Sequence, residues 1–181
     1  MLILPVERFK DREDLYRGPL ACTTPGNLAG WCTLVERYGK KSLKEVFQPA
    51  IEFARDGVVL TDFNEEMYME AAQDLKPHRA FYEDWNRTYA FGKGKVKAGQ
   101  VLKPHELAKT YQAIVTNGLD HLYKGALGKA LLAQVKKLGS CLAQDDFGAV
   151  EPEWLEPVAA EYRDIMVHTL PPPCEGFQLR H

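Results

Sequence analysis

The sequence predicts a mainly α-helical protein that ends in one β-hairpin. Between residues 27 and 139, apolar side chains recur every three or four positions, and capping and stop residues flank the repeats. The spacing changes to strict alternation only between residues 158 and 169. The chain of 181 residues is long enough for one domain with a substantial core. A chain of this size buries roughly 70% of its unfolded surface.

Residues 1–22 mix charges with few periodic apolar side chains, so we expect an extended lead-in before a helical body over 23–181. The first helix is predicted over about 27–38, where Thr24 is placed to cap it and Pro25 fits the first helical position. Gly39 is expected to supply a left-handed stop. The face predicted to turn inward carries Leu28, Trp31, Leu34 and Val35.

Two further helices are predicted, and each has a capping residue at its N-terminus. Ser42 and Glu45 form a capping box, and Gly57 ends the helix that they begin. Pro49 lies inside this helix and should kink it or split it into two short helices. Thr61 is expected to cap the next helix, over 62–75, with Pro77 just beyond it. The predicted apolar stripes are Val46, Phe47, Ala50, Ile51 and Ala54 in the first of these helices, and Phe63, Met67 and Ala71 in the second.

Residues 78–101 are less regular, and the segment GKGKVKAGQVL (92–102) alternates glycine with lysine. A phosphate loop needs a glycine-rich turn between an apolar strand and a helix. No apolar strand precedes this segment, which favours a plain hairpin or turn. A helix is then predicted over 105–117, and Asn117-Gly118 is expected to end it. A turn leads to another predicted helix over 126–139. A further turn is expected at Asp145-Phe147. The side chains expected to face inward in the first of these helices are Leu107, Tyr111, Ile114 and Val115.

A β-hairpin is predicted over about 157–170, with its turn at Arg163-Asp164, and it leads to three consecutive prolines, Pro171–Pro173. An isolated two-stranded hairpin is marginally stable and normally belongs to a larger sheet, which we do not find in this chain. We therefore expect an apolar edge that pairs with a partner or with another copy, giving a homo-oligomer.

Composition narrows the classes of function. The net charge of −2 excludes a nucleic-acid binder driven by bulk charge, although a local basic patch remains open. No apolar run approaches the ~20 residues that span a bilayer. The opening MLILPVERF is too short and too soon charged for a signal peptide. The chain is therefore either cytosolic or begins inside a longer protein, and its localisation stays unknown.

Cysteines and histidines show no metal-binding pattern. Four scattered cysteines without a CxxC spacing are expected to be buried thiols, with an approach of Cys22 to Cys32 as the alternative. No histidine pair has the helical spacing of a metal site, so no metal is expected. Cys174 beside Glu175, six residues after His168, is the sharpest candidate for a nucleophile. No oxyanion-stabilising element is recognisable around it.

Three stretches occur in the order in which one known family has them. The first joins TTPGNLAGWCTLVERYG to SLKEVFQPAIEFARDGVVL, and the second is AGQVLKPHELAKTYQAIVTNGLDHLYKGALGKAL. The third comprises GSCLAQDDF and EYRDIMVHTLPPPCEGF. From about Arg17 to Gly176, the chain resembles the large subunit of the γ-glutamyltransferases, also called γ-glutamyltranspeptidases or glutathione hydrolases.

The resemblance implies part of an N-terminal-nucleophile hydrolase, an αββα fold of which this chain would hold helices and one hairpin but lack most of the central sheet. Family members are precursors that cut themselves into a large and a small subunit. The small subunit begins with a threonine that attacks the γ-glutamyl amide, and its α-amine can act as the base. The acyl group then passes to water or to an amine. Substrates such as glutathione and the small subunit are the implied partners, and no cofactor is needed. Relatives are often periplasmic or extracellular.

In this family the triple-proline turn lies near the substrate end of the large subunit, which makes Cys174, Glu175 and Gly176 the implied substrate-site residues. The family usually has two small hydroxyl residues where this chain has Cys174 and Glu175, and Phe177 stands where a second glycine is common. A carboxylate at Glu175 would repel a substrate carboxylate if it faced the pocket. The departure suggests another γ-glutamyl or acyl amide as substrate.

Two functions remain open from the sequence. The chain stops at His181, so we expect it to carry no nucleophilic threonine and to be inactive alone. Arg12-Glu13 matches the family's substrate-binding Arg-Glu dipeptide but lacks the Ala-Pro that follows it, so the role is not carried over. The first function is therefore a large-subunit portion of an amide-cleaving enzyme. The alternative is a non-catalytic helical interaction module derived from the same family.

Overall fold

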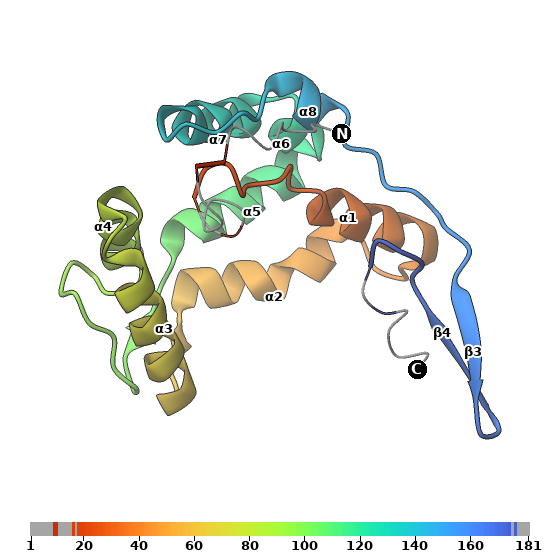
Figure 1. Cartoon of the computed structure of the whole chain (residues 1–181), viewed down its shortest axis with the longest axis horizontal. Coiled ribbons are helices and arrows are strands. Elements are labelled where there is room, and N and C mark those ends of the chain that lie inside the picture. The colour runs from red at the N-terminus through yellow and green to blue at the C-terminus, as the bar shows by residue number, and fades with distance from the viewer. Residues whose placement is uncertain (1–8, 11–15, 17, 175, 177–181) are drawn as a thin grey trace. The chain divides into compact units, whose positions relative to one another are not determined.

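The computed structural model describes residues 9, 10, 16, 18–174 and 176 (Figure 1). The chain divides into two compact units, Met1–Val150 and Glu151–His181. Helices build most of the described part of the first unit, and the second unit contains a β-hairpin. The expected lead-in over 1–22 lies largely outside the described residues. None of the described helices is long and apolar enough to cross a membrane.

Helix α1 spans Asn27–Tyr38, as predicted, but neither of its ends is made as expected. Its N-cap is Gly26, which offers no side chain, so the expectation that Thr24 caps the helix is wrong, and Pro25 precedes the first turn. Gly39 is extended, with φ of −68°, and is not a left-handed stop. A Cβ at Gly39 would collide with the backbone of Val35, so close approach explains the glycine.

The inward face of α1 also differs from the prediction. Trp31 and Leu34 are 57% and 51% exposed, whereas Leu28 is buried as expected. The buried face continues through Ala29 and Cys32, whose small side chains let other helices approach closely. Trp31 and Leu34 therefore point to the outer face of α1.

Helix α2 spans Leu43–Asp56 and confirms the predicted capping box. The Ser42 hydroxyl oxygen accepts from the Glu45 N–H at 3.3 Å, and the Glu45 carboxylate accepts from the Ser42 N–H at 2.9 Å. Pro49 lies within one continuous helix, so a split at Pro49 is wrong. Phe47 and Ile51 are buried on either side of Pro49, and packing along α5 holds both halves in one helix. Val46 and Ala50 of the predicted stripe are exposed.

A smaller group of elements follows α2: β1 (Val58–Val59), α3 (Asp62–Leu75), α4 (Arg79–Thr88) and β2 (Val101–Leu102). Thr61 caps α3 as predicted, through a reciprocal pair of hydrogen bonds with Asn64. The predicted stripe of α3 is wrong, because Phe63 and Met67 are 67% and 47% exposed. Helix α4, which the sequence did not predict, packs on the other face of α3.

The contact between α3 and α4 belongs to a second apolar cluster. The rings of Tyr68 and Tyr89 stack with centroids 5.1 Å apart. Strands β1 and β2 pair antiparallel, with Val58 opposite Leu102, so the chain after α4 returns to the end of α2. The cluster consists of Leu60, Ala72, Trp85, Ala90, Val96 and Leu102.

The remaining helices of the first unit are α5 (His105–Asn117), α6 (Asp120–Tyr123), α7 (Ala126–Lys137) and α8 (Gln144–Gly148). Gly118 ends α5 at a φ of 77°, as the predicted Asn-Gly stop requires. Leu107 is 41% exposed, against expectation, whereas Ile114 is buried as predicted and the neighbouring Ala108 is buried as well.

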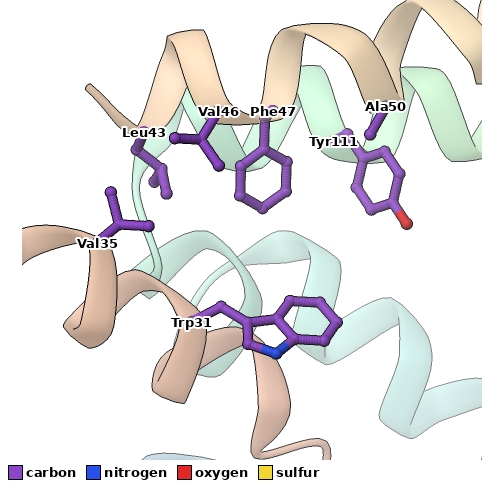
Figure 2. A pocket seen from close by; sticks show the side chains of 7 residues that line it. All are labelled: Trp31, Val35, Leu43, Val46, Phe47, Ala50 and Tyr111. Carbon is purple, nitrogen blue, oxygen red and sulfur yellow. The ribbon is translucent and has the colours of Figure 1, made fainter. Parts of the chain in front are cut away.

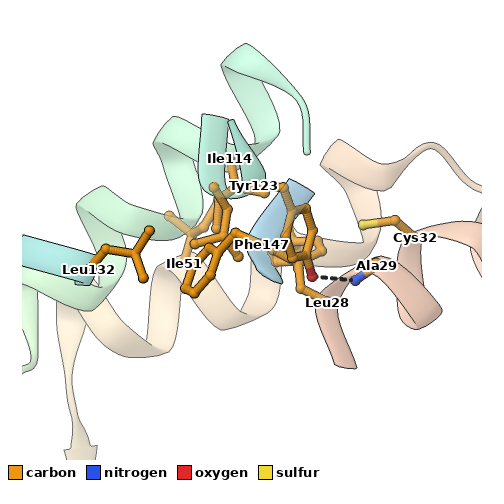
Figure 3. Close-up of a cluster of buried hydrophobic side chains, with 10 residues drawn as sticks. Leu28, Ala29, Cys32, Ile51, Ile114, Tyr123, Leu132 and Phe147 are labelled. Atoms are coloured by element: carbon orange, nitrogen blue, oxygen red, sulfur yellow. Dashed lines mark hydrogen bonds between the residues drawn. The ribbon is translucent and has the colours of Figure 1, made fainter. Parts of the chain in front are cut away.

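The main core lies where α1, α2, α5, α6, α7 and α8 meet (Figure 3). Phe147, only 1% exposed, is fully buried within it. The Tyr123 hydroxyl accepts a hydrogen bond from the Ala29 N–H at 3.1 Å and so ties α6 to the first turn of α1. The buried members are Leu28, Ala29, Cys32, Phe47, Ile51, Ile114, Leu122, Tyr123, Leu132 and Phe147.

The second unit contains the predicted hairpin, β3 (Val158–Tyr162) and β4 (Ile165–Thr169), which confirms the alternation in the sequence. Arg163 adopts a φ of 58° in the turn. Opposed residues of an antiparallel pair share a face, so the register divides the hairpin into two faces. One face is apolar except for its threonine and carries Val158, Ala160, Tyr162, Ile165, Val167 and Thr169. The other carries Ala159, Glu161, Met166 and His168.

Candidate functional site

The proline-rich turn after β4 holds the residues that the sequence implicates in substrate binding. The Cys174 N–H donates to the Pro171 carbonyl at 3.2 Å, which closes the turn, and the Pro172–Pro173 peptide is cis. Cys174 is an exposed free thiol. Glu175 lies outside the described residues, so its expected influence on the substrate stays a prediction.

Gly176 lies against strand β4. A Cβ at this position would collide with the Thr169 hydroxyl, so a larger residue here would require the Thr169 side chain to move. Neighbouring residues of a strand point to opposite faces, so His168 lies on the other face of the hairpin from Thr169. The structure therefore brings Gly176 to Thr169, a contact that sequence spacing does not reveal.

The four cysteines are free thiols in different surroundings, and the expectation that all four are buried is wrong. Cys22 and Cys174 are exposed, Cys141 is half-buried and Cys32 is buried. Burial, with a smaller contribution from Glu36, raises the pKa of the Cys32 thiol. A raised pKa disfavours the nucleophilic thiolate, so Cys32 serves as a small apolar core residue. Cys22 and Cys32 do not form a disulfide.

Backbone N–H groups of the glycine- and lysine-rich segment donate hydrogen bonds to side chains of the protein. The Gly94 N–H donates to Asn86 and the Ala98 N–H to Glu65, both at 2.7 Å. The Lys97 N–H donates to Gln100 at 2.8 Å. A phosphate cradle needs such N–H groups to point at the ligand, so this geometry argues against one. Val96, 1% exposed, anchors the segment in the second apolar cluster.

An apolar pocket of about 210 Å³ lies between α1 and α2, with one wall from α5 (Figure 2). In Figure 2 the Trp31 indole of α1 lies across the opening from Phe47 of α2. The Phe47 ring meets the Tyr111 ring edge-on, with centroids 5.6 Å apart, and both rings line the pocket. The lining residues are Trp31, Val35, Leu43, Val46, Phe47, Ala50 and Tyr111.

Sequence reasoning missed this pocket although it identified most of the side chains that form it. Trp31 and Val46 were assigned to apolar stripes, but the stripes were taken to be core-facing. Trp31 and Val46 are 57% and 45% exposed. Periodicity identifies an apolar face but does not reveal whether another part of the chain covers it.

Charged groups are distributed over the surface. Arg55 and Asp56 form an exposed ion pair at 2.6 Å, and the hydrogen bond from Arg55 lowers the pKa of Asp56. Hydrogen bonds from Ser42 lower the pKa of Glu45 in the capping box. In the described part of the chain, no three histidine, cysteine or acidic side chains are grouped to hold a metal ion.

Comparison with known proteins gives one consistent family. The family model described as Gamma-glutamyltranspeptidase matches residues 5–180. A glutathione hydrolase proenzyme of Escherichia coli is 29% identical over 157 residues, which are 87% of this chain and 27% of that protein. An acylase ACY 1 proenzyme of a Pseudomonas species (strain V22) is 31% identical over 170 residues, 91% of this chain and 28% of that protein.

Solved structures give the same result. The crystal structure of Helicobacter pylori gamma-glutamyltranspeptidase superimposes with a TM-score of 0.85 and 25% identity. The match covers 96% of this chain and 49% of that chain. The chain thus spans about a quarter of the length of the curated relatives and about half of the solved chain.

Proposed function

Because the chain belongs to the gamma-glutamyltranspeptidase family and matches part of its large subunit, we propose that it is the helical portion of an enzyme that hydrolyses or transfers γ-glutamyl or related acyl amides. The observation that carries this proposal is the match over residues 5–180 together with the TM-score of 0.85 over 96% of the chain. The chain folds as the corresponding half of the solved Helicobacter protein does, which supports a contribution to the same kind of active site.

In this proposal the nucleophile is a threonine at the start of a small subunit or downstream segment. Its hydroxyl oxygen attacks the amide carbonyl carbon, and its own α-amine accepts the hydroxyl proton. The C–N bond then breaks, and the departing amine takes up that proton. Water or an acceptor amine attacks the resulting acyl ester and releases the threonine. No metal ion or organic cofactor takes part in these steps.

This chain would supply the body that supports the site and the turn from Pro171 to Gly176 at its substrate end. The close approach of Gly176 to Thr169 gives that turn a fixed anchor on β4. We place Cys174 and Glu175 beside the acyl group of the substrate. A carboxylate at Glu175 disfavours a second carboxylate nearby, which favours acyl donors other than glutathione. The similarity to an acylase proenzyme supports this wider substrate class.

The test is the hydrolysis of γ-glutamyl-p-nitroanilide, and of an acyl-p-nitroanilide without the α-carboxylate, by this chain alone and together with the segment encoded directly downstream. Activity only with the downstream segment supports the proposal. Glu175→Ser should then raise activity on the γ-glutamyl compound relative to the other substrate. Activity of the chain alone would contradict the proposal and point to Cys174. A stable complex without activity on either substrate would favour the non-catalytic interaction module.

A further inference from the structure

Three lysines between α4 and β2 have no part in the proposed function. Lys93, Lys95 and Lys97 are all exposed. Lys95 and Lys97 flank Val96, which is buried in the second apolar cluster, so both ammonium groups point away from that cluster into solvent. In the part of the chain that the structure describes, none of the three forms an ion pair. We call residues 91–97 the lysine loop.

The backbone of the lysine loop is held in place by hydrogen bonds to α4 and to the turn that follows it. The Gly92 N–H donates to the Asn86 carbonyl, and the Lys93 N–H donates to the Ala90 carbonyl, both at 2.9 Å. The Gly94 N–H donates to the Asn86 side chain at 2.7 Å. Because the loop is already ordered, a ligand that binds it does not have to order its backbone.

Phe91, at the start of the loop, is 44% exposed and has a φ of 52°. Bulky residues rarely adopt this left-handed conformation, for which glycine is better suited. The loop therefore keeps an aromatic side chain partly in solvent at a position where the backbone does not favour it. An exposed ring and three unpaired positive charges occur within seven consecutive residues.

Two carboxylates of the adjoining helices α3 and α4 are engaged elsewhere. Glu65 accepts the Ala98 N–H at 2.7 Å, and Asp84 pairs with Arg87 at 2.6 Å. The charge of the lysine loop is thus not neutralised by these groups. The whole chain has a net charge of −2, so an anionic ligand is attracted only where it approaches this loop, within a Debye length of about 10 Å.

An anionic lipid surface fits these features. The loop lies on the outer side of α3 and α4 (Figure 1). Each lysine close to an anionic membrane adds to its affinity, and a neighbouring aromatic side chain enters the interfacial region. A single strand of nucleic acid, in contrast, is usually held in a basic groove with several stacking rings. The lysine loop contains one ring, which favours the membrane.

We infer that the lysine loop is a peripheral contact site for anionic phospholipid surfaces. Lys93, Lys95 and Lys97 bind the phosphate and carboxylate groups of the lipids, and Phe91 enters the headgroup region between them. This contact is reversible and requires no helix that spans the bilayer. It is independent of amide hydrolysis, so its failure would leave the proposed function unaffected.

The experiment is flotation of the 181-residue chain with vesicles of phosphatidylcholine alone or with about 30% phosphatidylserine. Flotation distinguishes vesicle-bound protein from protein that merely self-associates. Two triple variants lose the same number of charges. The loop variant carries Lys→Gln at residues 93, 95 and 97. The control variant carries the same change at three exposed lysines of α7, which are Lys129, Lys136 and Lys137. Circular dichroism verifies that both variants fold.

We expect the unchanged chain to float with the anionic vesicles and not with phosphatidylcholine alone, and about 0.5 M salt to release it. The loop variant should bind anionic vesicles roughly tenfold more weakly or worse, because each lost lysine lowers the affinity. The control variant should bind within about twofold of the unchanged chain. Equal losses in the two variants, or no binding of the unchanged chain to anionic vesicles, would overturn the inference.

Phe91→Gly tests the aromatic contact separately. Glycine suits the left-handed backbone at this position, so the variant should fold while losing the ring. We expect about threefold weaker binding to anionic vesicles, with the salt dependence kept. Unchanged binding would overturn the role given to Phe91. Binding of a labelled oligothymidine that the loop variant loses, without binding to vesicles, would make a nucleic acid the partner and would overturn the inference.

Discussion

The hydroxyl of Tyr123 caps helix α1 at Ala29, 94 residues earlier in the chain. It accepts the Ala29 N–H at 3.1 Å and donates to the Pro25 carbonyl at 2.8 Å. Ala29 is the third residue of α1, a position whose N–H has no partner within the helix. The Gly26 N-cap has no side chain, so Tyr123 takes the place of the usual Ser, Thr, Asn or Asp.

Replacing Tyr123 with phenylalanine tests this cap. The change keeps the ring in the core but leaves the Ala29 N–H and the Pro25 carbonyl without this partner. We expect the free energy of unfolding to fall by about 1 to 2 kcal/mol, as for the loss of a helix cap or a buried hydrogen bond. Urea denaturation followed by circular dichroism measures it.

The matched control for this change is Tyr111→Phe. Tyr111 packs against the same cluster, and its contact with Phe47 is made by the ring. This control should leave stability within about 0.5 kcal/mol of the unchanged chain. Equal losses in the two variants would show that the Tyr123 hydroxyl is not a cap.

The same tyrosine predicts a dependence of stability on alkaline pH. Burial raises the Tyr123 pKa, outweighing the hydrogen bond from Ala29 that lowers it. An unfolded tyrosine ionises near pH 10. Its contribution to folding is therefore fully present below that pH and is lost as the pH rises through the higher folded pKa.

Denaturation from about pH 8 to about pH 11 should show the unfolding free energy falling with pH in the unchanged chain. The fall should be shallower in Tyr123→Phe. It should not vanish, because burial also raises the pKa of Tyr68 and of Cys32. Parallel pH profiles for the two proteins would contradict the prediction.

Two helical glycines should respond oppositely to alanine. A Cβ at Gly128 in α7 would collide with the Leu122 carbonyl and come within 3.4 Å of Phe147, so Gly128→Ala must push α6 and α7 apart. We expect a loss of about 1 to 3 kcal/mol, as for other overpacked cores. Gly30 in α1 has open space around its Cα, so Gly30→Ala should stabilise the fold by about 0.5 to 1 kcal/mol. Thermal melting separates the two, and a loss in both would show that α1 needs its glycine for another reason.

Features made by residues within a few positions of one another were predictable from the sequence. The reciprocal hydrogen bonds of Ser42 with Glu45 and of Thr61 with Asn64 each span three residues, and both helices begin where predicted. The alternation of the hairpin likewise fixed its strands and its turn at Arg163-Asp164. In these places, local hydrogen bonds and side-chain period determine the structure.

Features that depend on distant residues were not predictable. The sequence contains the Phe63 and Met67 stripe, but α4 packs on the other face of α3 and leaves that stripe exposed. The cap of α1 comes from Tyr123 and not from the nearby Thr24, because the Tyr123 hydroxyl accepts the hydrogen bond from the Ala29 N–H, 94 residues earlier, in the first turn of α1. Local spacing carries no information about either partner.

The candidate site divides in the same way. The family resemblance drew attention to the turn from Pro171 to Gly176, but only the folded chain shows that Gly176 lies against Thr169 of β4. The pocket was missed because Trp31 was taken to face the core. An apolar stripe has the same spacing in the sequence whether the chain's own elements bury it or leave it exposed.

The β-hairpin predicts self-association of the chain. Its nearly apolar face carries Tyr162 and Ile165, both 62% exposed, and a hairpin with exposed edges and an apolar face tends to pair with another strand. We expect sedimentation velocity to show dimers or larger assemblies that increase with concentration. Ile165→Lys places a charge on this face and should shift the chain to monomer. Met166→Lys places the same charge on the opposite face, beside Glu161, and should leave the assemblies intact. A clean monomer at high concentration, or an equal effect of both lysines, would show that this face does not mediate assembly.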